Sequence, residues 1–226
     1  WVRAHHGDSR AVIDCLAVDP PEEITIIQLL SRAGSQKLVF LANWQIAQRE
    51  VVLKRFIGSE AAERLIPREL QLHPLSMEHP NIIETHLLKN GRGERFLVER
   101  RLPMVLTDSW SSDGVHEAAN LLCDISSALS FLHERQLVHG DIKPDNIMVD
   151  LSDPDHPIVN IIDYGLAKSE SGDDTGGLCG ALGYMSPEVV GQLGSSQKSD
   201  VFALGICLLQ LYYFENAADD FSSTSV

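Results

Sequence analysis

The first hundred residues alternate between short apolar runs and turn residues, a pattern typical of β-strands. Five runs rich in Val, Ile, Leu and Phe span residues 24–30, 37–42, 50–56, 82–89 and 95–101. Residues 59–72 are instead rich in Ala, Glu, Arg and Leu, as in a helix that Pro67 and Pro74 shorten or bend. This part of the chain therefore predicts a sheet with one inserted helix.

After Pro103 the apolar positions recur at helical spacing. Within residues 117–135, four apolar side chains lie three or four positions apart, which predicts one buried helix face: Leu121, Ile125, Leu129 and Leu132. Three further elements are predicted: a hairpin from the apolar runs at 147–149 and 158–162, a loop at the Gly/Ser/Asp-rich residues 169–177, and a buried helix at 201–214, which is apolar almost all round.

Composition excludes some classes of partner. The 226 residues carry a net charge of −14, so phosphate backbones and anionic lipid surfaces would be repelled, and we expect neither a nucleic-acid nor a membrane partner. The apolar runs are too short to span a bilayer. Four scattered cysteines without a C-x-x-C pair favour reduced thiols in a soluble, cytoplasmic protein. The oligomeric state stays open.

The strongest chemical signal lies between the predicted helix and the predicted hairpin. Residues 139–146 read His-Gly-Asp-Ile-Lys-Pro-Asp-Asn, and Asp163, followed by Tyr and Gly, comes directly after an apolar strand. Read separately, these are solvated loop residues. Read together, a carboxylate in one loop and further oxygen ligands after a strand suit phosphoryl transfer from a Mg²⁺-bound nucleotide.

This string resembles the catalytic loop and the metal-binding Asp-Phe-Gly motif of protein kinases. The resemblance implies that Asp141 orients the acceptor hydroxyl and takes its proton, and that Lys143 neutralises charge on the transferring group. It also implies that Asn146 and Asp163 bind Mg²⁺.

The resemblance extends upstream to a nucleotide site. Residues 51–54, Val-Val-Leu-Lys, match the family's strand with an ATP-contacting lysine, and the hinge that holds adenine would lie near residues 99–102. The implied ATP-binding residues are Gly34, Val39, Val52, Lys54, Glu69, Glu99 and Met148. Glu69 is the expected partner of Lys54, although Glu60 and Glu63 remain possible.

Downstream, residues 186–188, Ser-Pro-Glu, resemble the end of the kinase activation segment, and Asp200 would hold the backbone of the catalytic loop. The implied fold is α+β and bilobal, with an antiparallel sheet and one helix in the N-lobe and a mostly helical C-lobe. Residues 1–21 would be an extension, 22–102 the N-lobe and 103–226 the C-lobe. Because the chain ends shortly after the central buried helix, the lower helices of the C-lobe are expected to be missing.

Three positions depart from the family pattern. The place of the glycine-rich loop holds one glycine, Gly34, which predicts weaker or unusual nucleotide binding. Gly140 stands where most kinases have the Arg that pairs with a phosphorylated activation loop, so switching by such a pair is not expected. Ala181 replaces a Thr whose hydroxyl bridges the catalytic Asp and Lys, which predicts lower turnover.

The favoured interpretation is an ATP-dependent serine/threonine protein kinase that uses Mg²⁺ and acts on a protein substrate. One alternative is a pseudokinase that binds nucleotide or partners without transfer, as the departures suggest. A second alternative is a small-molecule phosphotransferase of the aminoglycoside or choline kinase type, which also writes His-Gly-Asp in this loop. Three features favour a protein substrate instead: the Lys143-Pro144 pair, the Gly-Leu-Ala-Lys string at 165–168, and the block from Ser186 to Asp200.

Overall fold

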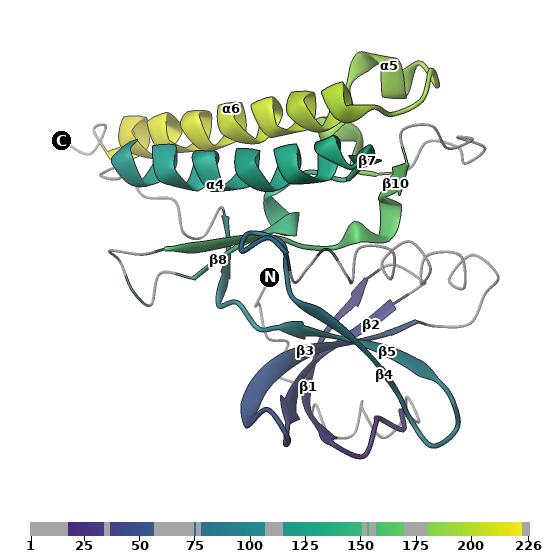
Figure 1. Ribbon diagram of the computed structural model, residues 1–226. Coiled ribbons are helices and arrows are strands. Elements are labelled where there is room, and N and C mark those ends of the chain that lie inside the picture. Colours follow the sequence, from purple (N-terminus) through teal and green to yellow (C-terminus); the bar gives the residue numbers. More distant parts are fainter. Residues whose placement is uncertain are drawn as a thin grey trace. The chain divides into compact units, whose positions relative to one another are not determined.

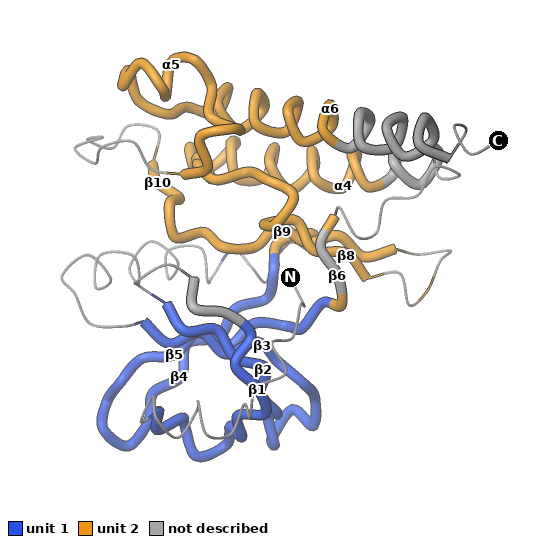
Figure 2. The backbone as a smooth tube through the Cα atoms, turned by 180° about the vertical axis from the view of Figure 1, so that it is seen from behind, with its two compact units in different colours: residues 1–78, 83–102 blue, residues 79–82, 103–226 orange. Residues whose placement is uncertain are grey.

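The computed structural model describes residues 18–33, 37–56, 75, 78–106, 115–150, 153, 157–169 and 180–222. The chain divides into two compact units, residues 1–78 with 83–102 and residues 79–82 with 103–226, which Figure 2 shows in blue and orange. The predicted helix at 59–72 lies outside the described residues. Of the described helices, none is both long and apolar enough to cross a membrane.

The first unit contains a five-stranded antiparallel sheet (Figure 1). Its strands, in sheet order, are β1 (Ile24–Ala33), β2 (Lys37–Trp44), β3 (Arg49–Phe56), β5 (Arg95–Arg100) and β4 (Thr85–Lys89). The five predicted strands are thus confirmed, with one boundary corrected. The fourth strand begins at Thr85 and not at residue 82, because Ile82 forms an isolated parallel bridge with Ile161 in the second unit.

Period-two alternation gives this sheet two distinct faces. One face buries a cluster of aliphatic and aromatic side chains, which includes Leu38, Phe40, Val51, Leu53, Phe96 and Val98. The strand register places the intervening residues, among them Val39, Val52, Lys54, Leu97 and Glu99, on the opposite face. Val39, Lys54, Leu97 and Glu99 are also buried. A lysine and a glutamate are therefore enclosed on this face beside the aliphatic side chains of Val39 and Leu97.

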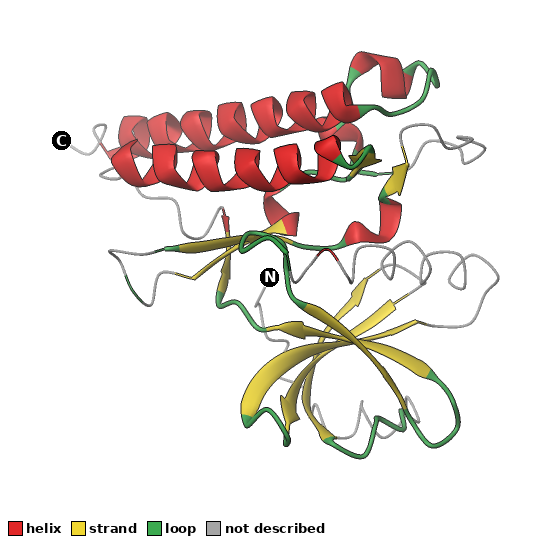
Figure 3. Cartoon of the chain, in the orientation of Figure 1, coloured by secondary structure: helices red, strands yellow, loops and turns green. Residues whose placement is uncertain are grey.

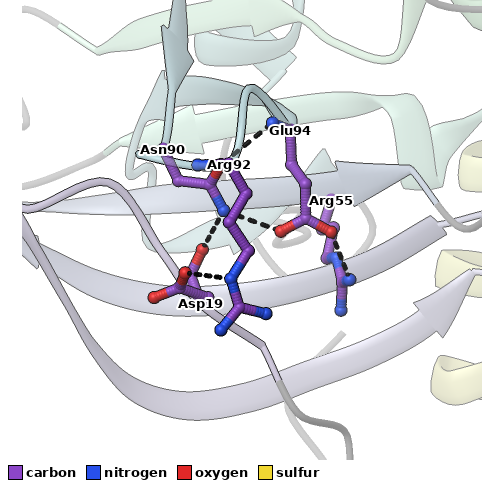
Figure 4. A network of polar contacts seen from close by, with 5 residues as sticks. All are labelled: Asp19, Arg55, Asn90, Arg92 and Glu94. Atoms are coloured by element: carbon purple, nitrogen blue, oxygen red, sulfur yellow. Dashed lines mark hydrogen bonds and ion pairs between the residues drawn. The ribbon is translucent and has the colours of Figure 1, made fainter.

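The β4–β5 turn is fixed by the amide of Asn90, which is almost fully buried (Figure 4). Its Nδ2 donates to the Asp19 carbonyl and to Glu94 Oε2, both at 2.7 Å. Its Oδ1 accepts from the backbone N–H groups of Arg92 (3.0 Å) and Glu94 (2.9 Å). Glu94 also accepts from Arg55 of β3 at 2.8 Å. One side chain therefore ties the turn to the segment before β1 and, through Glu94, to β3.

The second unit is mainly helical (Figure 3). Its long helices α4 (Val115–Glu134) and α6 (Gln197–Ser222) run side by side in both views (Figure 1, Figure 2). The shorter elements are β6 (Met104–Val105), β7 (Leu137–Val138), η2 (Pro144–Asn146), β8 (Ile147–Asp150), β9 (Ile158–Ile161), η3 (Tyr164–Leu166), β10 (Lys168–Ser169), η4 (Leu182–Tyr184) and α5 (Pro187–Val190). Strands β6, β8 and β9 form one small antiparallel sheet, and β7 pairs with β10.

The predicted helix at 117–135 is confirmed as α4, and its four spaced apolar side chains, Leu121, Ile125, Leu129 and Leu132, are buried. The predicted hairpin is confirmed as β8 and β9. The prediction of an all-round buried helix at 201–214 is wrong for α6. Ala203, Leu204 and Cys207 are buried, but Val201 and Leu209 are 60% and 53% exposed. Within the described residues, only one side of α6 is covered. Some of its apolar side chains therefore stay exposed to solvent.

Candidate active site

The loop that carries the predicted catalytic residues joins β7 to β8, and the carboxylate of Asp200 holds its first residues. Asp200 Oδ2 accepts from the His139 backbone N–H at 2.8 Å, and Oδ1 accepts from the Gly140 N–H at 2.9 Å. His133 Nε2, on the last turn of α4, lies 2.9 Å from Oδ2. Asp200 is 1% exposed, so an ionised group that would be costly to bury is satisfied by three donors. This geometry agrees with the expectation for Asp200.

His139 joins this loop to the segment that ends β9. Its ring is fully buried, and its Nε2 lies 3.2 Å from the Ile162 carbonyl, which can only accept, so Nε2 carries the proton. Its Nδ1 accepts from the Asp141 backbone N–H at 3.2 Å. Both contacts fit the neutral imidazole, and burial lowers the pKa of His139, opposed by the nearby carboxylates of Asp200, Asp141 and Asp163. The His139 ring also meets the Tyr164 ring edge-on, with centroids 5.0 Å apart.

The Asp141 carboxylate lies at the centre of three donors. Lys143 Nζ donates to Oδ2 at 2.6 Å, and Asn146 Nδ2 donates to the same oxygen at 2.9 Å. The backbone N–H of Ala181 donates to Oδ1 at 3.2 Å. The structure therefore brings Asp141, Lys143 and Asn146 together, as their spacing in one loop predicted. These contacts fix the carboxylate as an oriented hydrogen-bond acceptor that can receive a proton.

Two glycines shape this site. Gly140 has φ +79°, and a Cβ there would lie 3.2 Å from the Leu166 carbonyl oxygen. Gly180 has φ +112°, and a Cβ there would lie 3.4 Å from Asp141 Oδ1. A side chain at either position would combine an unfavourable backbone conformation with a close contact. The glycine that replaces the family's usual Arg therefore suits the backbone found at position 140.

The predicted metal ligands lie at the ends of neighbouring segments. Asn146 is 2% exposed, and its carbonyl accepts from the Ile162 N–H at 2.9 Å, one residue before Asp163. Asp163 follows β9 in the left-handed conformation (φ 61°, ψ 72°). The Asn146 amide donates both to the Asp141 carbonyl (2.8 Å) and to its carboxylate, which leaves the amide oxygen as an acceptor for a cation. An amide oxygen and a carboxylate suit Mg²⁺, a hard cation that keeps water and phosphate oxygens as its other ligands.

In the part of the chain that the structure covers, no group of three or more His, Cys, Asp and Glu side chains could hold a metal ion.

The first unit holds four of the predicted nucleotide-binding residues on one sheet face. Lys54 Nζ donates to Glu99 Oε1 at 2.6 Å, and both side chains are buried. Val39 on β2 is opposite Lys54, and Val52 on β3 is opposite Glu99. Of the remaining predicted residues, Met148 lies half-buried on β8 in the second unit, opposite Asn160 of β9. Gly34 and Glu69 lie outside the described residues.

Sequence reasoning missed two histidines of this site. His139 was part of the quoted string, but no function was assigned to it, and His133 was taken only as part of a helix. His139 precedes Asp141 by two residues, a spacing at which a histidine ring nitrogen can accept a hydrogen bond from the later residue's backbone N–H. The contact of His133 with Asp200 joins residues 67 positions apart and has no local signal.

Comparison with known proteins places the chain in a family. A family model described as "Protein kinase domain" matches residues 33–224. Serine/threonine-protein kinase PrkC of Bacillus subtilis (strain 168) is 32% identical over 85% of this chain and 31% of its own length. Calcium/calmodulin-dependent protein kinase type 1 of Macrobrachium nipponense is 30% identical over 89% of this chain and 61% of its own. Serine/threonine-protein kinase pkn3 of Myxococcus xanthus is 29% identical over 82% and 37%. The chain thus spans between a third and three fifths of these relatives and belongs to the protein kinase domain family.

Proposed function

We propose that the chain is an ATP-dependent protein kinase that transfers the γ-phosphate of Mg-ATP to serine or threonine hydroxyls of a protein substrate. One observation carries the proposal: the Asp141 carboxylate is oriented by Lys143, Asn146 and the Ala181 N–H in a loop that a buried carboxylate anchors. An oriented acceptor beside a cation is what the transfer of a hydroxyl proton and a phosphoryl group requires. The printed names of the relatives from Bacillus subtilis and Myxococcus xanthus, both serine/threonine-protein kinases, support serine/threonine acceptors.

In this proposal Asp141 accepts the hydrogen bond of the acceptor hydroxyl and aims its oxygen at the γ-phosphorus. The new O–P bond forms while the bond between the γ-phosphorus and the bridging oxygen of ADP breaks, and Asp141 takes the hydroxyl proton. Lys143, 2.6 Å from Asp141 in the structure, balances the negative charge of the transferring group. Most of the rate comes from such positioning and electrostatic stabilisation.

The metal and the nucleotide would be held by the residues that the resemblance implies. Asn146 and Asp163 would hold Mg²⁺, which when bound supplies positive charge along the phosphates. Lys54 would contact the phosphates, with Gly34, Val39, Val52, Glu69, Glu99 and Met148 as the other nucleotide-binding residues. Because the Glu99 side chain contacts Lys54, its backbone is the part left to hold adenine.

The Ala181 position favours one second candidate, a pseudokinase. The side chain of Ala181 has no hydroxyl group. Among the described contacts, residue 181 therefore reaches Asp141 through its backbone N–H alone. The loss of one bridging hydroxyl lowers a rate more readily than it abolishes a reaction. We therefore rank the active enzyme above the pseudokinase and above a small-molecule phosphotransferase.

The test is transfer of label from γ-labelled Mg-ATP to a generic protein substrate, followed by identification of the modified amino acid, with Asp141→Asn as the control. Label on serine or threonine that disappears in the variant supports the proposal. Nucleotide binding without label on protein favours the pseudokinase. Label that appears only on an added aminoglycoside or choline favours the small-molecule enzyme.

A further inference from the structure

An ion pair lies inside the first unit's sheet. Lys54 Nζ and Glu99 Oε1 are 2.6 Å apart, and the two side chains are 6% and 5% exposed. Lys54 is opposite Leu97 and Glu99 is opposite Val52, so the two charged residues are diagonal neighbours on adjacent strands and on one face. The contact therefore follows from the β3–β5 register and involves no loop.

Burial makes the charge of each partner depend on the other. An ammonium group out of water is stable only when a negative group compensates it, and Glu99 supplies that compensation from within the sheet. Around the pair, the same face carries the aliphatic side chains of Val39, Val52 and Leu97, and also the buried Thr85, opposite Glu99, and the buried Lys37, two residues before Val39. The enclosure of these side chains keeps the local dielectric low. A phosphate that approaches Lys54 thus meets an ammonium group already bound to a carboxylate.

We propose that Glu99 is an internal counter-ion that competes with the phosphates of the nucleotide for Lys54 and so sets how tightly the chain binds them. This inference rests on the proposed function, in which Lys54 contacts ATP. The carboxylate holds Lys54 in place without nucleotide, so the phosphates bind the ammonium group only by weakening this ion pair. Its effect must grow with the negative charge of the ligand and must depend on the Lys54 ammonium group.

Glu99→Gln separates charge from shape, because the amide keeps the length of the side chain and an oxygen that can accept from Lys54 Nζ. The dissociation constants of ATP, ADP and adenosine are measured by titration calorimetry for the full chain and for this variant. Removal of the Glu99 charge, which competes with the phosphates, is expected to lower the dissociation constant of ATP about tenfold. ADP gains less, and adenosine, which has no phosphate, is unchanged.

Two controls make the result specific. Glu94→Gln removes a carboxylate of the β4–β5 turn that pairs with Arg55 of β3 at 2.8 Å, and it should leave ATP affinity within about twofold. In a Lys54→Met background, Glu99→Gln should no longer favour ATP over adenosine, because the ammonium group that mediates the competition is gone.

An unchanged or weaker ATP affinity in Glu99→Gln, with normal binding by the wild type, overturns the competition and leaves the proposed function intact. A gain that is equal for adenosine overturns it as well. If the folded wild type binds no nucleotide, both proposals fail together. Thermal unfolding then shows whether the pair itself is real: Lys54→Met and Glu99→Leu should each lower the melting temperature, and the double variant should be more stable than either single one.

Discussion

Asp200 anchors the predicted catalytic loop, and the effect of a substitution there can be worked out from its hydrogen bonds. The change is Asp200→Asn, which keeps the volume of the side chain but replaces one oxygen by an NH₂ group. In the structure, Oδ2 accepts from the His139 N–H and faces His133 Nε2, while Oδ1 accepts from the Gly140 N–H. The asparagine oxygen can serve only one of these two positions. At the other position its NH₂ group meets another N–H donor.

The magnitude follows from these contacts. A hydrogen bond to a charged group contributes about 1.5–3 kcal/mol, and a buried donor left without an acceptor costs about 1–3 kcal/mol. Asp200→Asn loses the charge and at least one such bond, so we expect the loop to be destabilised by about 2–4 kcal/mol. At about 1.4 kcal/mol per factor of ten, this corresponds to a roughly 30-fold to 1000-fold larger population of the open loop.

Hydrogen–deuterium exchange measured on peptides that contain His139 and Gly140 tests this directly. Their amide exchange should accelerate by that factor, while peptides from β2 and β3 keep wild-type rates. The matched control is Asp145→Asn, because Asp145 is an exposed carboxylate in the same loop and its loss should change stability by less than about 0.5 kcal/mol. Exchange at 139–140 that accelerates less than about twofold would refute the anchoring role.

Three further predictions concern stability and reactivity. Asn90→Ala removes four hydrogen bonds from the turn shown in Figure 4 and should lower the free energy of unfolding of the first unit by about 2–3 kcal/mol. Urea titration followed by Trp44 fluorescence measures this change, and a loss below about 0.5 kcal/mol would contradict the role of the network. Burial lowers the pKa of His139 below its ordinary 6.5, so the unfolded chain binds the proton first, and the stability of the second unit should fall as the pH drops below about 6.5. Urea titration followed by far-ultraviolet circular dichroism, to which the helices of the second unit contribute most, should show a smaller fall between pH 7.5 and 5.5 in His139→Gln, and an equal fall would remove His139 as the cause. Burial raises the pKa of Cys207 to about 12, so iodoacetamide at pH 8 should leave it unlabelled in the folded chain while the exposed Cys123 reacts, as read by peptide mass spectrometry; equal labelling would contradict this.

Much of the fold could be predicted from local patterns. Short runs rich in Val, Ile, Leu and Phe identified the five strands, because the sheet buries such side chains, among them Phe40 and Leu53. The spacing of Leu121 and Ile125 identified α4 for the same reason. The apolar composition of α6 predicted a helix able to bury most of its surface, but composition does not say what covers it. Here Val201 is 60% exposed.

The site shows a similar division. Asp141, Lys143 and Asn146 meet because they share one short loop, and their roles were implied by the resemblance of the whole string to the protein kinase catalytic loop. The contact of Lys54 with Glu99 depends on the register of two strands that are 45 residues apart in sequence, and the sequence analysis assigned Glu99 to the hinge. A local sequence pattern does not determine which residue of β5 lies diagonal to Lys54. That neighbour is set by the register between β3 and β5, which the sequence alone does not give.

The measurement that tests the central claim most directly compares transfer with binding in Asp141→Asn. Single-turnover transfer of the γ-phosphate to a protein substrate is measured beside the dissociation constant for Mg-ATP, in the wild type and in this variant. A general base typically contributes about 10²- to 10⁴-fold, so transfer should fall by that factor while the dissociation constant stays within about twofold. Transfer that survives the substitution, or a wild type that binds Mg-ATP without transfer, would contradict the claim that this loop catalyses phosphorylation.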